Sequence, residues 1–199
     1  MKLCSISRTL PAPAGPAAGC GASDGYLRAI DAAADIPIRW TTDAAERAGA
    51  LALRERVFCG EQGVPVEEEL DGLDDEAAHL VAIDGSDGGD RVIGTLRLLE
   101  HDGTAKVGRV AVDAGWRRRG IAQRMLELAL LRARSEGCSR ARLAAQLDAV
   151  ELYEKAGFAV ESERFFEAGI EHVWMGTALG DTPGIPLRGT GGRTGLPDR

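Results

Sequence analysis

The feature that most constrains this sequence is a strand that runs through an arginine-rich turn into a helix, VAVDAGWRRRGIAQRML at residues 110–126. Gly120 ends the arginine run, and without a Cβ it allows a ligand to approach the backbone closely. The first amides of the new helix have no partners within the helix, and its dipole favours an anion there by about 0.3–1 kcal/mol. The arginines add charge and forked donors, so the segment predicts a phosphate- or pyrophosphate-binding turn. It matches neither a Walker A loop nor GxGxxG, and a solvated basic turn is the alternative interpretation.

Strands alternate with helices on both sides of this turn, which predicts a mixed sheet with helices on its faces, in the α/β (α+β) class. Asp43 and Glu46 form a capping-box-like pair at the start of the first helix. The long acidic stretch at 59–78 is predicted to be a loop. The expected strands are 36–40, 79–84, 92–100, 105–113, 141–146, 158–165 and 170–179, and the expected helices run from about 43 to 58, from 120 to 136 and from 149 to 157.

Both ends of the chain differ in composition from this central region. Residues 1–35 and 180–199 are rich in Ala, Gly and Pro and hold six of the eight prolines, so we expect disordered segments there and one domain over 36–179. Arg8 interrupts the apolar start of the chain and prolines follow at once, which argues against a signal peptide. The four cysteines lie far apart, so we expect reduced thiols, a cytoplasmic protein and no metal site.

Charge and hydropathy exclude several functions. The net charge is −7, which disfavours binding to nucleic acid, and no run of about 18 apolar residues predicts a membrane span. Residues 61–90 hold eleven acids and no Lys or Arg, whereas 106–142 hold ten Lys and Arg and three acids. The second region suits an anionic ligand and the first a cationic one, although both patterns also fit solvated surfaces.

The run RRRGIA at 117–122 resembles the Arg/Gln-x-x-Gly-x-Gly/Ala signature of the GNAT superfamily, the acyl-CoA-dependent N-acyltransferases. Downstream, AAQLDAVELYEKAGF is similar to the family's fifth strand, its fourth helix with a tyrosine, and the Gly-Phe that opens its sixth strand. RERVFCGEQGVPVEEELDGLDDEAAHL and FFEAGIEHVWM resemble the ElaA-like subgroup. These four blocks, in the family's order and spacing, cover about 36–179.

The resemblance implies a single GNAT-like domain with a mostly antiparallel sheet that splays between its fourth and fifth strands. The pantetheine arm of acetyl-CoA, the expected co-substrate, would lie in that gap and pair with the backbone of Val110, Ala111 and Val112. The backbone amides from Arg118 through Gly120 and Ile121 to Ala122 would hold the pyrophosphate. Arg117 and Arg119 are the expected side-chain partners of the phosphates, although the sequence does not show which of the three arginines points inward.

The same resemblance makes Tyr153 the expected acid that protonates the leaving thiolate, against the alternative of a core tyrosine with a paired hydroxyl. The amine must be neutral to attack, so a base is also expected. Some family members use a glutamate on the fourth strand, which here holds no carboxylate. The candidates for the base are Glu69, Asp71, Asp74, His79 and His172.

The expected reaction is transfer of an acetyl group from acetyl-CoA to a primary amine by direct attack on the thioester, with a small molecule or peptide as acceptor. A non-catalytic acyl-CoA sensor or interaction module is the alternative; it would keep Gly120 and the arginines but not need Tyr153. A homodimer is possible. Glu61, Gln62, Arg97 and Gln146 are further candidates for the wall of the pocket.

Overall fold

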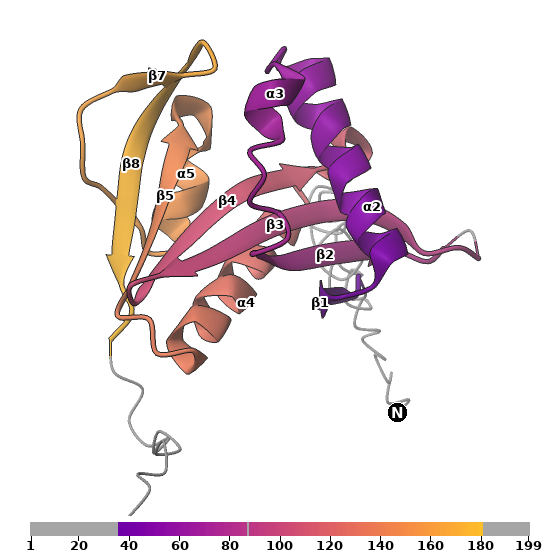
Figure 1. Ribbon diagram of the computed structural model, residues 1–199, viewed down its shortest axis with the longest axis horizontal. Helices are drawn as coiled ribbons and strands as arrows, with labels where there is room; N and C mark the ends of the chain where they lie inside the picture. The colour runs from indigo at the N-terminus through magenta and orange to yellow at the C-terminus, as the bar shows by residue number, and fades with distance from the viewer. Residues whose placement is uncertain (1–35, 87, 181–199) are drawn as a thin grey trace, which may run out of the picture.

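Residues 36–86 and 88–180 are described by a computed structural model, in which one mixed sheet carries helices on both faces (Figure 1). The predictions for 1–35 and 180–199 therefore concern residues outside the described ones, apart from Gly180. The strand order is β1-β2-β3-β4-β5-β8-β6, and β7 pairs with β8. The strands are β1 Ile38–Thr41, β2 Ala78–Asp84, β3 Arg91–His101, β4 Thr104–Val112, β5 Arg140–Gln146, β6 Ala159–Val160, β7 Phe165–Glu167 and β8 Ile170–Ala178; the helices are α2 Ala44–Arg54, η1 Glu55–Glu61, α3 Val66–Glu69, η2 Ala114–Trp116, α4 Ile121–Ser135, η3 Leu147–Ala149 and α5 Val150–Lys155.

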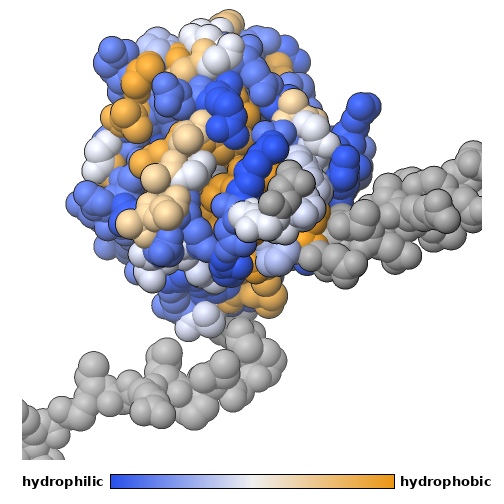
Figure 2. Space-filling view, turned by 90° about the vertical axis from the view of Figure 1, so that its right-hand side faces the viewer, coloured by the Kyte–Doolittle hydropathy of each residue, from blue (hydrophilic) through white to orange (hydrophobic). Residues whose placement is uncertain are grey.

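Helices α2 and α4 cover opposite faces of the sheet because neighbouring strand residues point to opposite sides. Leu53 of α2 packs in a cluster with Val81 of β2, whereas Met125 of α4 packs in the main core with Leu80. On the face shown in Figure 2, hydrophilic residues form most of the rim and hydrophobic residues gather toward the centre. No helix within residues 36–86 and 88–180 is long and apolar enough to cross a membrane.

Only one half of the predicted capping box forms at the start of α2, the half made by Asp43. The Asp43 carboxylate accepts hydrogen bonds from the backbone N–H groups of Ala45 and Glu46, both at 2.9 Å. The Glu46 carboxylate does not return to Asp43 but pairs with Arg39 of β1. A cross-element ion pair thus replaces the local contact that the spacing predicted.

The first helix runs further than predicted. It continues past Phe58 as the π-helix η1, whose end is marked by the bond from the Gln62 N–H to the Val57 carbonyl at 3.2 Å. The stretch 59–78 is therefore not one loop, because it contains the end of η1 and the short helix α3. A π-helical turn is rare and often marks a functional site.

The predicted strand at 158–165 is two short strands, β6 and β7. Between them the Ser162 hydroxyl, instead of a backbone carbonyl, accepts the N–H of Trp174 at 2.9 Å. This side-chain bond replaces part of the ladder with β8 and separates the two pieces.

The sheet opens between β4 and β5, the one parallel pair among the strands of residues 36–86 and 88–180. These strands pair only at Thr104–Arg140, Ala105–Ala141 and Lys106–Arg142. Beyond these residues β5 continues to pair with β8 as far as Gln146, while β4 stays with β3. The prediction of a mixed, mostly antiparallel sheet that splays between its fourth and fifth strands is confirmed.

Candidate functional site

A cleft of about 930 Å³ occupies the splay. The end of η1 and α3 form one wall, β4 and the turn that follows it form the centre, and β5, α5, β7 and β8 form the other wall. Backbone groups of β4 beyond its last pair with β5 are not used in a β4–β5 ladder. The cleft therefore offers backbone donors and acceptors outside the β4–β5 ladder to an extended ligand, although the Val112 carbonyl already accepts from the Arg117 guanidinium at 2.9 Å.

The predicted anion-binding turn lies at one end of this cleft. Gly120 has a left-handed backbone with φ +78°, and a Cβ placed there would meet no atom within 4 Å, so the space before it is open. The first bond of α4 runs from the Arg124 N–H to the Gly120 carbonyl at 3.1 Å. The N–H groups of Ile121 and Ala122, both in the cleft lining, precede that bond and have no acceptor in their own helix. Together they form an opening suited to a phosphate.

The three arginines of the turn take different positions. Arg117 and Arg118 line the cleft, and Arg119 does not. The guanidinium of Arg119 stacks on the Trp116 ring with its Cζ 4.6 Å from the ring centroid. The structure therefore does not bring Arg119 into the lining of the cleft, because its guanidinium is stacked on Trp116.

Two polar contacts from the end of η1 cross the cleft. The Arg117 guanidinium donates to the Glu61 carboxylate at 2.6 Å. The amides of Gln62 and Gln146 bond reciprocally at 3.2 and 3.0 Å, although 84 residues separate them. Both glutamines line the cleft, as predicted for the pocket wall, whereas Glu61, predicted with them, is not part of the lining.

Val110, Ala111 and Val112 line the centre of the cleft. Val110 is part of a β-bulge, and Ala111 and Val112 follow it, because Thr95 pairs with Ala111 and Arg97 pairs with Gly108. A bulge bends its strand and leaves backbone groups outside the ladder. The structure thus brings the three predicted backbone residues to the splay.

Tyr153 enters the cleft from α5. Its side chain is buried beside Phe158, with the ring centroids 6.2 Å apart, and lines the cleft. The ring belongs to the main core, as in the alternative of a core tyrosine, but within the described part of the chain its hydroxyl makes no hydrogen bond, so the paired hydroxyl of that alternative is not found. Burial, with a smaller contribution from Asp148, raises the pKa of the Tyr153 hydroxyl to about 12. The hydroxyl therefore stays protonated at neutral pH.

His172 lies on β8 in the same wall, opposite Gln146 of β5. Its Nδ1 is 2.9 Å from the Ile170 carbonyl oxygen. Because a carbonyl can only accept, Nδ1 carries the hydrogen in the neutral ring, which leaves the lone pair on Nε2. Phe165 stacks on the ring at 5.8 Å between centroids and limits its rotation.

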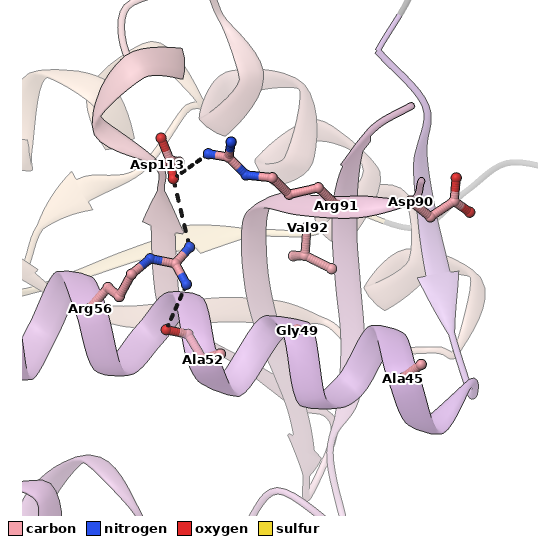
Figure 3. A pocket seen from close by; sticks show the side chains of 8 residues that line it. All are labelled: Ala45, Gly49, Ala52, Arg56, Asp90, Arg91, Val92 and Asp113. Atoms are coloured by element: carbon pink, nitrogen blue, oxygen red, sulfur yellow. Dashed lines mark hydrogen bonds and ion pairs between the residues drawn. The ribbon is translucent and has the colours of Figure 1, made fainter. Parts of the chain in front are cut away.

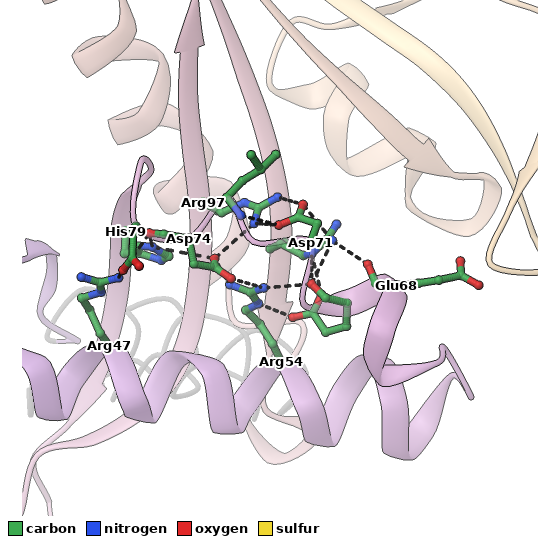
Figure 4. A network of polar contacts seen from close by, with 11 residues as sticks. Arg47, Arg54, Glu68, Asp71, Asp74, His79 and Arg97 are labelled. Carbon is green, nitrogen blue, oxygen red and sulfur yellow. Dashed lines mark hydrogen bonds and ion pairs between the residues drawn. The ribbon is translucent and has the colours of Figure 1, made fainter.

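The acidic candidates for a base are held in an ion-pair network (Figure 4). Arg97 donates to both oxygens of Asp71, and this contact holds the pKa of that carboxyl well below its usual range. Burial opposes a similar fall at Asp74, but Arg54 and Arg97 still lower its pKa. Glu69 is buried against Arg54. These carboxylates are occupied by guanidinium groups, so the structure does not support Asp71 as the base.

His79 does not reach the cleft. It is buried on β2, and its Nε2 is 2.8 Å from the Asp74 carbonyl oxygen. The structure therefore gives His79 a contact within the network and does not place it in the catalytic role predicted for it. Of the predicted histidines, only His172 lines the cleft.

A second groove of about 410 Å³ lies between α2 and β3 (Figure 3). Its charged groups are paired, since Asp113 contacts Arg91 at 2.8 Å and Arg56 at 3.6 Å. A Cβ on Gly49 would come within 2.8 Å of the Val92 side chain, so this glycine serves close packing of helix on sheet. Within residues 36–86 and 88–180, no three His, Cys, Asp or Glu side chains gather to hold a metal.

Comparison with known proteins places these features in context. Residues 46–179 match the family model described as an acetyltransferase (GNAT) domain. The uncharacterized N-acetyltransferase YjcF of Bacillus subtilis is 38% identical over 127 residues, which make up 63% of this chain and 88% of that protein. The crystal structure of an acyl-CoA N-acyltransferase from Pseudomonas aeruginosa is 30% identical, with a TM-score of 0.61, and the match covers 70% of this chain and 99% of that one. Escherichia coli ElaA shares the fold, with a TM-score of 0.62 at 24% identity over 71% of this chain and 98% of ElaA.

Proposed function

Since the chain belongs to the GNAT acetyltransferase family, whose members transfer an acyl group from acyl-CoA, we propose that it moves the acetyl group of acetyl-CoA to a primary amine. The observation that carries the proposal is a single cleft with an anion-binding turn at one end and an unpaired tyrosine hydroxyl in its wall. A protein that only binds the coenzyme would need the anion-binding turn, whereas a catalyst would need both the turn and the tyrosine hydroxyl.

The coenzyme has two parts that suit the two parts of the cleft. Its pyrophosphate fits the amides after Gly120, with Arg117 and Arg118 as charged partners. A phosphate there competes with Glu61 for Arg117. The amides of its pantetheine arm match the β4 backbone beyond the last pair with β5, and donors from this backbone would polarise the thioester carbonyl.

His172 is the proposed base, and Tyr153 the proposed acid. The neutral amine attacks the carbonyl carbon, a C–N bond forms, and Nε2 of His172 takes the proton that the nitrogen releases. The C–S bond then breaks, and the Tyr153 hydroxyl protonates the leaving thiolate. The products are an N-substituted acetamide and free coenzyme A, and solvent returns the proton from His172 to Tyr153.

The test of the proposed function is a titration calorimetry measurement with acetyl-CoA, followed by a thiol-release assay with a panel of amines. The panel contains polyamines, amino acids, aminoglycosides and peptides with a free N-terminus. A lysine-like amine is only about one part in a thousand neutral at pH 7.4, so thiol release is expected to rise between about pH 7 and pH 9. Binding without thiol release for any amine would favour an acyl-CoA-binding module, and absence of binding would overturn the proposal.

We expect His172→Asn to lower kcat/KM for the amine by about 10²-fold or more, because it removes the basic nitrogen. Asparagine is chosen because its N–H group can still donate to the Ile170 carbonyl, so the local backbone contact survives. The matched control is His101→Asn, at the exposed end of β3 outside the cleft, which should leave turnover unchanged. Equal kcat/KM in both variants would assign proton removal to water instead of His172.

A further inference from the structure

Arg109 has a backbone conformation that is unusual for its position. It lies inside β4, yet its φ is +52°, a region that favours glycine. The register of β3 and β4 shifts by one residue at this point, so Leu96 of β3 faces both Arg109 and Val110. A side chain other than glycine persists in such a conformation only where its surroundings hold it there.

The contacts of the Arg109 side chain stabilise this backbone conformation. Its guanidinium donates to the carbonyl oxygens of Glu68 and Glu69, both at 3.0 Å, and pairs with the Glu69 carboxylate at 2.5 Å. It also donates to the Asp71 carboxylate at 3.2 Å. These contacts join the bulge to α3 and to the loop that follows it.

The partners of Arg109 are themselves fixed. Glu69 is bound by Arg54, which is fully buried in α2, and Asp71 is bound by Arg97 of β3. The bulge is therefore connected through Arg109 to a buried network that includes α2 and β3. Figure 4 shows Arg54, Asp71 and Arg97 of this network. Forked contacts of this kind require the planar guanidinium group, and a lysine ammonium does not reproduce them.

We propose that Arg109 is a positioning residue: it holds the β4 bulge in the shape that presents the backbone of Val110–Val112 to the thioester. This inference rests on the proposed function, because it assigns a role in the same reaction. Arg109 acts through the backbone, so its loss should affect the chemical step more than coenzyme affinity, which depends mainly on the turn at Gly120. The same contacts join α3, in one wall of the cleft, to β4 at its centre.

The test compares Arg109→Gly and Arg109→Lys with the wild-type protein. Glycine keeps the backbone conformation accessible but removes the anchor, and lysine keeps a positive charge without the fork. For Arg109→Gly we expect kcat to fall by about tenfold or more while the dissociation constant of acetyl-CoA changes by less than about threefold, with Arg109→Lys in between. The control is Asp102→Gly, which relieves a similar φ of +48° in the β3–β4 turn, outside the cleft, and should keep wild-type kcat.

Hydrogen exchange of the backbone is the second measurement, since it does not depend on activity. In Arg109→Gly, exchange at 107–112 should become faster while exchange in α4 stays as in the wild type.

Wild-type kcat in Arg109→Gly, or unchanged exchange at 107–112, would overturn the role of Arg109. An equal loss of kcat and of acetyl-CoA binding would also overturn it, because that result describes general damage to the cleft. If Arg109→Gly does not fold, the same criteria apply to Arg109→Lys. Absence of wild-type turnover would instead count against the proposed function, and the exchange result would then decide on Arg109 alone.

Discussion

Replacing Tyr153 with phenylalanine is expected to lower kcat by about 10²-fold or more, with little change in acetyl-CoA binding. The hydroxyl makes no hydrogen bond within the described part of the chain, so its removal leaves no protein group unpaired. The ring contact with Phe158 is kept, and the variant should therefore fold as the wild type does. The measurement is steady-state thiol release beside calorimetric binding of acetyl-CoA.

The pH dependence of kcat and of stability provides a second test of the role of Tyr153. Because burial raises the pKa of Tyr153 to about 12, the protonated donor persists at pH 8–10, and kcat should not fall there through loss of this proton. A pKa that is raised in the folded state stabilises the protein below the unfolded value of about 10, and this contribution is lost as the pH rises toward 12. Tyr153→Phe should therefore lose less stability than the wild type as the pH rises from about 10 toward 12. Full turnover in Tyr153→Phe would show that another group protonates the thiolate.

Replacing Gly120 with tryptophan is expected to weaken acetyl-CoA binding by about 10²-fold or more, because the new side chain covers the amides that hold the pyrophosphate. The space in front of Gly120 is open, so the indole meets no protein atom at its Cβ and the fold is kept. The φ of +78° makes any side chain here cost about 1–2 kcal/mol of stability. Calorimetric titration of acetyl-CoA measures the loss of affinity.

Gly88→Trp is the matched control for Gly120→Trp. Gly88 also has a φ of +78°, a Cβ added to it would meet no atom within 4 Å, and it lies in the loop between β2 and β3, outside the cleft. Both variants should lose similar stability, but only Gly120→Trp should lose acetyl-CoA. Equal affinity in the two variants would show that the coenzyme binds away from this turn.

The position of the arginine-rich turn followed from local sequence. A strand, an arginine-rich turn, a glycine and a helix predict unpaired amides at residues 120–122 from chain geometry alone, because these amides lack partners in any helix that starts there. The sequence likewise predicted the first helix from its Asp43 cap and the mixed sheet from alternating strands and helices. These features depend on residues that are close together in the chain.

The roles of individual side chains depended on contacts between distant residues. Asp71 and His172 were both candidates in the sequence, but Arg97 of β3 occupies Asp71, whereas the Ile170 carbonyl leaves Nε2 of His172 unprotonated in the neutral ring. No local pattern predicts which arginine stacks on Trp116, because rotamers are selected by packing.

The order of most elements and the position of the arginine-rich turn therefore followed from local geometry and periodicity, and the family followed from the resemblance of four sequence blocks to the GNAT superfamily. Only the tertiary structure decided which acids are neutralised by arginines, that Gln62 meets Gln146 across the cleft, and that Arg109 anchors the bulge. The reason is physical: a charged side chain changes its chemistry according to the groups that surround it, and folding brings those groups from elements far apart in the chain.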